Sequence, residues 1–446
     1  MTGDTGRHPD DAHPGGSAAA REMRALARPL NGVDDLDPLV ERITGARFVC
    51  IGEASHGTHE YYRWRCLLAR RLIEERGFTW IGVEGDWPDC WRINRWLRGQ
   101  ADRELDARGL LARFERWPTW LWANEDVAEF LAWLREWNAG RPPAEQVGFY
   151  GLDVYSLWDS LREIIAWLQV NEPGAMDTAR QAWRCFMPYR EDPHSYAWST
   201  RLVPETCEAD VVALLVEVRR RAGVRAGSDE DAFDAAQNAE VAANAERYYR
   251  IMVRGDRDSW NIRDHHMADT IDRLAAHLGP QSKGMIWEHN THVGDARATD
   301  MARDGLVNVG QLVRERHSID GVVLVGFASH QGSVLAAAAW GSPELALPVP
   351  AAVPSSHEGI LHSVLGTDAL LVFPDDRAGP WLGAWLPHRA IGVVYQPGHE
   401  AGNYVPTRMG GRYDALIWLE ETTALVPLHH EPRPEEPEYE TEPTGF

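Results

Sequence analysis

Short apolar runs recur along the chain, and each closes on a polar or glycine-containing turn. Several are continuous and rich in β-branched residues, which is typical of strands buried on both faces of a parallel sheet. Between the first two runs, Tyr61–Arg76 has leucine and isoleucine at helical spacing and ends at Gly77, which predicts a strand–helix–strand unit. We therefore expect an α/β fold with a central, mainly parallel sheet flanked by helices. The predicted strands are Arg47–Gly52, Thr79–Val83, Val147–Leu152, Gly284–Trp287, Gly321–Phe327, Ala369–Phe373, Ile391–Tyr395 and Ala415–Leu419.

One long section, residues 156–280, has no strand signal and interrupts this series. Its periodic, alanine-rich sequence predicts long packed helices, so we interpret it as a large helical insertion or subdomain. The α/β core then comprises residues 26–155 and 281–428. Residues 1–25 lack periodicity and predict a disordered lead, whereas residues 429–446 are rich in proline and glutamate and predict a disordered acidic tail.

Charge and composition exclude several classes of partner. The chain has 45 basic and 67 acidic residues, a formal net charge of −22, which disfavours binding to nucleic acid. No stretch approaches the ~18 uncharged apolar residues of a membrane span, and we expect neither a secretory signal nor a membrane partner. The cysteines are odd in number and widely spaced, which predicts buried free thiols and a cytoplasmic location. They are Cys50, Cys66, Cys90, Cys185 and Cys207. Composition predicts no particular oligomeric state.

Polar side chains follow several of the predicted strands at the point where each strand ends. Because the carboxyl ends of parallel strands share one edge, and ligands bind at that edge, we expect these groups to lie together. Each residue taken alone also suits a structural role, such as a helix cap or a buried polar group. Their coincidence at strand ends favours a functional site. The residues are Glu53, His56, Glu84, Trp87, Asp153, His289, His292 and His330.

The chemistry that suits this set is the activation of water. A histidine held by a carboxylate acts as a general base near neutral pH, because the carboxylate fixes its tautomer and stabilises the imidazolium. Glu53 lies three residues before His56, close enough within one turn to orient the ring. Arg65 could pair with Glu84 or bind a developing oxyanion. Tryptophans near the mouth, among them Trp87, could form the wall of an apolar substrate pocket.

Several common catalytic motifs are missing from the sequence, and two alternatives stay open. There is no G-x-S-x-G, G-x-x-x-x-G-K-[ST], G-x-G-x-x-G or H-E-x-x-H. The sequence therefore gives no indication of the serine nucleophile of α/β-hydrolases, of a nucleotide-binding loop or of a zinc-binding helix. Glu53, His56, Glu84 and His289 are also suitable ligands for Zn²⁺ or Mn²⁺, so a metal-dependent hydrolase is one alternative. A small-molecule-binding or biosynthetic protein without esterase activity is the other.

Longer motifs in the chain resemble the erythromycin esterase family. The resemblance spans roughly residues 35–430 and includes GEASHGTHEYYRWR, VEGDWPDCWRINRWLRG, FYGLDVYSLWDSL, SWNIRDHHMADT, WEHNTHVGDARATDM and GFASHQGSVLAAAAWG. It implies a cytoplasmic, metal-independent hydrolase that opens the macrolactone ester of erythromycin-type antibiotics, and hence antibiotic resistance. An activated water attacks directly, without a covalent intermediate and without a cofactor. The expected partner is a small-molecule ester or lactone, either a macrolide or another ester.

The resemblance also implies roles for individual residues. The family's base histidine matches His56 and its glutamate partner matches Glu53. Arg65, Glu84 and His289 then bind the substrate, stabilise the tetrahedral intermediate or protonate the leaving alkoxide. We assign His292, Trp87, His330 and Asp153 to substrate binding. Macrolide specificity would come from a cleft wall built by the helical insertion.

Overall fold

The computed structural model describes residues 17–189, 191–202, 206–223, 229–254, 258–317 and 321–430. Its strands are β1 (Ala27–Pro29), β2 (Phe48–Ile51), β3 (Trp80–Val83), β4 (Gly148–Gly151), β5 (Gly284–Trp287), β6 (Val322–Ala337), β7 (Glu344–Val349), β8 (Ala369–Val372), β9 (Trp385–Arg389), β10 (Tyr404–Arg408) and β11 (Ala415–Thr422). Nine of them form one mixed sheet in the order β1-β8-β11-β6-β2-β5-β3-β4, with β7 paired to β6. The other two, β9 and β10, form a separate antiparallel pair.

The central part of the sheet is parallel. Strands β11, β6, β2, β5, β3 and β4 pair in parallel, whereas β1, β8 and β7 add antiparallel strands. Strands β2 to β5 are only four residues long and buried throughout, as expected for continuous apolar runs covered on both faces. The prediction of a mainly parallel sheet flanked by helices is confirmed.

Two strand predictions differ from the structure. The run at 391–395 forms no strand and makes only isolated bridges, through Ile391 to Ser55 and through Val394 to Ala337. Its apolar residues instead pack beside the extension of β6, where Ile391 and Tyr395 belong to a small separate core. Strand β6 continues ten residues beyond the predicted end at Phe327, because β7 and β11 supply pairing partners along its second half.

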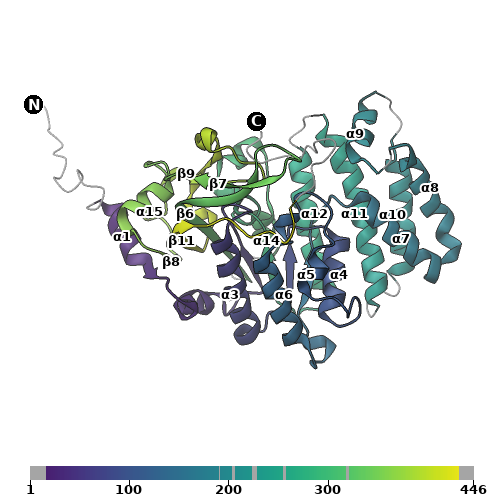
Figure 1. Cartoon of the computed structure of the whole chain (residues 1–446), viewed down its shortest axis with the longest axis horizontal. Coiled ribbons are helices and arrows are strands. Elements are labelled where there is room, and N and C mark those ends of the chain that lie inside the picture. The colour runs from purple at the N-terminus through teal and green to yellow at the C-terminus, as the bar shows by residue number, and fades with distance from the viewer. Residues whose placement is uncertain are drawn as a thin grey trace, which may run out of the picture.

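The α-helices surround this sheet (Figure 1). They are α1 (Ala18–Leu26), α2 (Asp37–Ile43), α3 (His59–Arg76), α4 (Trp87–Leu97), α5 (Ala107–Leu111), α6 (Glu125–Asn138), α7 (Leu157–Asn171), α8 (Met176–Phe186), α9 (Pro193–Leu202), α10 (Glu208–Ala222), α11 (Glu230–Met252), α12 (Asp258–His277), α13 (Asn290–Val293), α14 (Val309–His317), α15 (His357–Leu365) and α16 (Met409–Arg412). None of the helices in the described ranges combines the length and the apolar character that a membrane crossing requires.

Helix α1 corrects part of the predicted disordered lead. Ser17 caps the helix by accepting a hydrogen bond from the backbone N–H of Ala20, and the side chains of Ala20 and Met23 are fully buried. A cap and a buried apolar stripe are sufficient to hold a short helix against the body of a protein. Residues 1–16 of the predicted lead and 431–446 of the predicted tail lie outside the described residues.

Helices α7 to α12 occupy residues 157–277 and gather on one side of the molecule (Figure 1). Alanines along α11 pack against the neighbouring helices around a separate apolar cluster. Cys185 and Cys207 form a disulfide there, so the prediction of five free thiols is wrong for this pair. Cys50, Cys66 and Cys90 are free and buried, as predicted.

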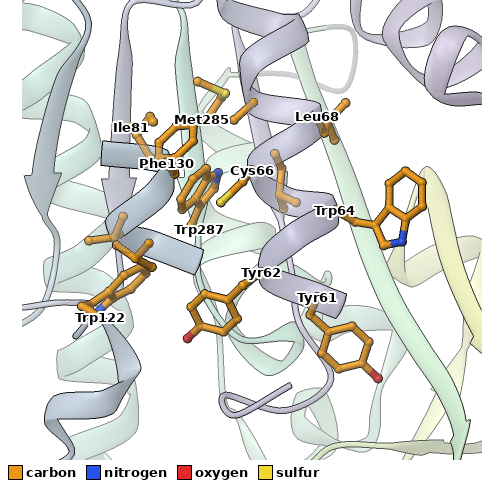
Figure 2. Close-up of a cluster of buried hydrophobic side chains, with 14 of the residues drawn as sticks. Tyr61, Tyr62, Trp64, Cys66, Leu68, Ile81, Trp122, Phe130, Met285 and Trp287 are labelled. Carbon is orange, nitrogen blue, oxygen red and sulfur yellow. The ribbon is translucent and has the colours of Figure 1, made fainter. Parts of the chain in front are cut away.

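Helix α3 links the sheet to the site, because it begins directly after the turn that follows β2. Figure 2 shows its buried face against strands β3 and β5. The packed side chains include Tyr61, Tyr62, Cys66 and Leu68 of α3, Ile81 of β3, and Met285 and Trp287 of β5. This large apolar contact fixes the position of the preceding turn relative to the sheet edge.

Candidate active site

One cavity lies at the carboxyl edge of the parallel strands. His56 follows β2, Glu84 follows β3 and Asp153 follows β4, while His289 and His292 follow β5; all of them line the cavity. Segments far apart in the sequence therefore meet at one point, as the strand-end pattern predicts. The helical insertion adds one further polar group to this set, Arg263 of α12.

The turn from β2 to α3 positions His56 tightly. Nδ1 of His56 donates a hydrogen bond to Oε1 of Glu53 at 2.8 Å, which leaves Nε2 as the nitrogen with a free lone pair in the neutral ring. A Cβ at Gly57 would lie 1.8 Å from the carbonyl oxygen of Leu335. The position therefore requires glycine, and β6 holds the turn from behind.

Arg65 holds the other side of Glu53. Its Nη2 lies 2.8 Å from Oε2 of Glu53 and donates to the carbonyl oxygen of Gly52 at 2.9 Å. The side chain is fully buried and does not line the cavity. The prediction that Arg65 pairs with Glu84 or meets an oxyanion is wrong, because helical side chains lean toward the helix N-terminus and this one reaches back to β2.

The pKa of His56 depends on these neighbours. Burial favours the neutral ring and lowers the pKa of His56, but the hydrogen bond to Glu53 and the charges of Glu84 and Glu53 outweigh it. The pKa of His56 therefore lies above its ordinary value. A more basic imidazole is a stronger proton acceptor once it is neutral.

His289 lies beside His56, with 4.8 Å between the ring centroids. Its Nδ1 accepts a hydrogen bond from the backbone N–H of Thr291 at 3.3 Å and lies 2.8 Å from the hydroxyl oxygen of that residue. The proton of the neutral ring is therefore on Nε2. Nε2 forms no hydrogen bond within the described part of the chain.

Electrostatics keep His289 neutral. Burial and the charge of His56 lower the pKa of His289 well below its ordinary value, with a further lowering by His292. The charge of Glu84 opposes this effect without reversing it. His289 therefore offers the cavity an N–H group, whereas His56 offers it a lone pair.

Arg263 is the guanidinium that lines the cavity, and sequence reasoning did not assign it a role. Its Nη2 donates to Glu84 and to Asp153, each at 2.7 Å, and its Nε donates to Asp153 at 3.0 Å. Burial raises the pKa of Glu84, but the charges of His292, Arg263 and His56 hold that pKa well below its usual range. The second oxygen of Glu84 accepts the backbone N–H of His289 at 2.8 Å. These contacts tie α12 to β3, β4 and β5.

His292 belongs to this network more than to the substrate. Its Nδ1 donates to Asp264 at 2.9 Å, and its Nε2 lies 3.1 Å from Nη1 of Arg263 and 3.4 Å from Oε1 of Glu84. Its ring stacks on Trp260, with 4.4 Å between the ring centroids. Both ring nitrogens of His292 are therefore engaged, whereas His289 keeps one free. Of the two histidines in the HNTH motif, His289 is the one available to a ligand.

Two residues assigned to substrate binding lie elsewhere. Trp87 is fully buried, donates to Asp234 at 2.7 Å and stacks on Trp91, so it is a core residue between α4 and the helical insertion. His330 does not follow a strand end, because β6 continues past it, and its ring stacks on His362. Neither side chain lines the cavity, and both predictions are corrected.

The apolar wall of the cavity comes from the α/β core. Residues between α5 and α6 form one part of it, and residues after β6 and β9 form another. The helical insertion contributes the polar Arg263, so the prediction that it builds the specificity wall is not supported. The apolar lining residues include Phe114, Trp117, Leu121, Trp122, Trp340 and Val393.

Two acidic residues on the wall are shifted toward their neutral forms. Burial, opposed by the charge of Arg116, raises the pKa of Asp86 to about 8. Burial and the charge of Asp159 raise the pKa of Asp89 to about 7. Oδ1 of Asp86 is buried and forms no hydrogen bond within the described residues. This part of the cavity therefore holds carboxyl groups that are partly protonated at neutral pH.

The suitability of the cluster for a metal ion can be judged from its donor atoms. Both oxygens of Glu53 face partners, both oxygens of Glu84 accept N–H groups, and Nδ1 of His56 and of His289 are engaged. Among the described residues, no group of three ligand atoms within 4.8 Å includes any of these four side chains. The arrangement suits proton transfer better than coordination of an ion.

The chain is similar to proteins of one known family. The family model described as Erythromycin esterase matches residues 73–422. Erythromycin esterase type II of Escherichia coli is 32% identical over 130 residues, which are 29% of this chain and 28% of that protein. The putative hydrolase YbfO of Bacillus subtilis (strain 168) is 21% identical over 429 residues, 90% of each chain.

Solved structures show the same fold. A succinoglycan biosynthesis protein superposes with a TM-score of 0.73 at 20% identity, covering 95% of this chain and 100% of that one. The erythromycin esterase EreC, as a mutant in its open conformation, superposes with a TM-score of 0.64 at 18% identity, covering 88% and 95%.

Proposed function

Because the chain belongs to the erythromycin esterase family, we propose that it is a hydrolase that opens an ester or lactone with a water activated by His56. The observation that carries this proposal is the pairing of His56 and His289 in one cavity. One ring offers a lone pair and the other offers an N–H group. Hydrolysis needs a lone pair that takes a proton from the water and an N–H group that stabilises the developing oxyanion.

The proton of the attacking water passes to Nε2 of His56. Glu53 holds the ring through Nδ1 and stabilises the imidazolium that forms, while Arg65 holds Glu53 from the opposite side. Glu53 contacts His56 and Arg65 contacts Glu53, so both are positioning residues that do not touch the reacting water. The imidazolium of His56 can then return this proton to the leaving alkoxide, which completes the reaction without a separate acid.

His289 stabilises the tetrahedral intermediate. Its low pKa keeps the ring neutral, so it acts as a hydrogen-bond donor and does not transfer a proton. The donor is preorganised, because Thr291 holds one side of the ring and Glu84 holds its backbone N–H. Preorganised donors in a site that excludes water are among the largest contributions to ester hydrolysis.

The residues around the cavity support direct attack by water over a covalent mechanism. The described residues that line it include no serine and no cysteine. The hydroxyl of Thr291 is buried and engaged with His289. The sequence has no serine elbow, so the usual nucleophile of ester hydrolases has no counterpart here.

The size of the cavity favours a substrate smaller than a macrolide. It encloses about 100 Å³, whereas sites for drug-sized ligands enclose ~300–1,000 Å³. The apolar part of its wall is mainly aromatic, and the partly protonated Asp86 and Asp89 also line it. We therefore propose a compact ester or lactone with an apolar body as the substrate.

The proposal is tested by presenting the purified full chain with esters and lactones of increasing size, from acidic to mildly alkaline pH. The expected result is hydrolysis of compact members of the series by the wild type and not by His56→Ala. Intact-protein mass spectrometry during turnover should find no acyl adduct. If ligands bind and no ester is hydrolysed at any pH, the chain is a binding protein and the proposal fails.

A parallel assay separates the metal-dependent alternative. Activity is measured after exhaustive chelation and again after Zn²⁺ or Mn²⁺ is restored. Activity that survives chelation supports the proposed mechanism. Activity that depends on the restored ion, with no change in the unfolding temperature, would make Glu53, His56 and His289 metal ligands.

A further inference from the structure

We propose that a second site, separate from the cavity, binds a divalent transition-metal ion such as Zn²⁺. Three side chains form it: His330 of β6, Glu420 of β11 and His362 of α15. One ligand atom of each lies within 4.8 Å of the other two. None of the three lines the cavity that contains His56, so the proposal does not depend on the hydrolase.

Secondary structure places two of these ligands side by side. Strands β6 and β11 pair in parallel, with Ser329 opposite Leu419 and Gln331 opposite Glu421. His330 and Glu420 are therefore opposite each other and project from the same face of the sheet. Positions on paired strands are rigid, which is the condition for a site that keeps its geometry without a ligand.

Helix α15 supplies the third ligand over the same face. The ring of His362 stacks on the ring of His330, with 3.6 Å between centroids and 3° between planes. Nδ1 of His362 also forms a hydrogen bond to Oε1 of Glu420. His362 is solvent-exposed, so its ring can turn toward a bound ion and the ion can reach the site from solution.

Two atoms of the cluster point to a missing ligand. His330 is only 7% exposed, and its Nδ1 is buried without a hydrogen-bond partner in the described chain. Oε2 of Glu420 is also buried without one. Buried polar atoms in native proteins nearly always have a partner. A cation between the three side chains would satisfy both atoms at once.

The donor set determines which ion is expected. Two imidazoles and one carboxylate suit Zn²⁺ and its neighbours, whereas Mg²⁺ and Ca²⁺ prefer oxygen ligands alone. Three protein ligands leave a fourth position for water in a tetrahedral shell. Such an ion would join β6, β11 and α15, and its expected effect is to stabilise this part of the fold.

Titration of the chelator-treated full chain with Zn²⁺ tests the proposal, with calorimetry and thermal unfolding as the two measurements. The wild type should bind an ion at this site and unfold at a higher temperature. His362→Ala and Glu420→Gln should each weaken that binding at least ~10-fold and lose the thermal shift. His362 is exposed, so its variant should fold and keep its ester hydrolysis.

Glu421→Gln is the matched control. It makes the same change of charge at the next residue, where the side chain of Glu421 accepts from Gln331, and it should bind Zn²⁺ like the wild type. Equal Zn²⁺ binding in Glu420→Gln, His362→Ala and Glu421→Gln would place the ion elsewhere on the chain. That result, or no binding by the wild type, overturns the proposal.

Discussion

The rings of His56 and His289 lie 4.8 Å apart between centroids, and they present opposite hydrogen-bonding groups to one cavity. Glu53 accepts a hydrogen bond from Nδ1 of His56, whereas the backbone N–H of Thr291 donates one to Nδ1 of His289. Opposite shifts follow from these neighbours, since the pKa of His56 is raised and that of His289 is lowered. Two adjacent histidines thus obtain different roles from their surroundings.

Replacement of His56 by alanine should remove the general base. Turnover of an accepted ester should fall by ~10²–10⁴-fold, while the unfolding temperature should change little because the side chain contributes little to the core. His59→Ala is the control: its ring pairs with Asp126 outside the cavity. Steady-state rates and thermal melts of both variants measure the effect, and an active His56→Ala enzyme contradicts the mechanism.

The substitution Glu53→Gln should change both the rate and its pH dependence. Glu53 helps to raise the pKa of His56, and activity rises with pH as His56 loses its proton. Removal of that charge should therefore shift the acidic limb of kcat/KM to lower pH and reduce the plateau. Glu129→Gln, at an exposed position, should leave the pH profile unchanged. A wild-type profile for Glu53→Gln would remove this residue from the mechanism.

Arg263→Ala should destabilise the fold as well as the site. It leaves the buried carboxylates of Glu84 and Asp153 without their shared cation, and breaking a buried pair costs ~3–5 kcal/mol. Arg162→Ala removes two exposed pairs, with Asp159 and Glu191, and should cost about 1 kcal/mol or less. Denaturant unfolding measures both. Equal losses for the two variants would show that the Arg263 network is not a principal support of the fold.

The stability of the chain should depend on Asp86 between acidic and neutral pH. The pKa of Asp86 is raised from 3.8 to about 8, so the native state keeps this proton to higher pH than the unfolded chain does. The free energy of unfolding then falls as pH rises between these values, by at most about 1.4 kcal/mol per pH unit. Asp86→Asn should reduce this slope, and the exposed Asp177→Asn should retain it, as measured by denaturant unfolding at several pH values.

Gly57→Ala tests the tight turn under His56. The added Cβ would meet the carbonyl oxygen of Leu335 at 1.8 Å, so the turn must move and activity should fall together with stability. Overpacking of this kind costs ~1–3 kcal/mol. Gly45→Ala is the control, because a Cβ there meets nothing within 4 Å. Thermal melts and ester turnover are measured for both variants. Losses in Gly57→Ala alone would show that position 57 requires glycine, whereas equal losses would indicate a general effect of replacing a glycine.

The strand-end pattern located the site but not all of its members. Four residues follow strands whose carboxyl ends meet: His56, Glu84, Asp153 and His289. The apolar runs and the polar residues after them were sufficient to predict that these four lie together. Arg263 lies within a helix far along the chain and follows no strand. Only the packing of α12 against the sheet edge brings it to the cavity.

The failures have equally specific causes. Arg65 was expected at the cavity, but the direction of side chains on α3 turns it back toward Glu53. His330 was expected at a strand end, but β11 pairs with β6 through this position and β7 pairs with it beyond, so β6 continues. Trp87 was expected on the wall, but it points to Asp234 of the helical insertion. Each error concerns the direction of a side chain or its partner, which residue type and spacing alone do not specify.

The amino-acid sequence alone determined the strands of the parallel core, the turn that carries His56, and the likeness to one family. These features depend on local periodicity and on residue type, which any segment expresses by itself. The tertiary structure decided which guanidinium meets Glu84, which of two histidines keeps a free nitrogen, and how much room the cavity encloses. Those properties arise from contacts between segments that only the folded chain brings within a few ångströms, and so they follow from packing and not from local pattern.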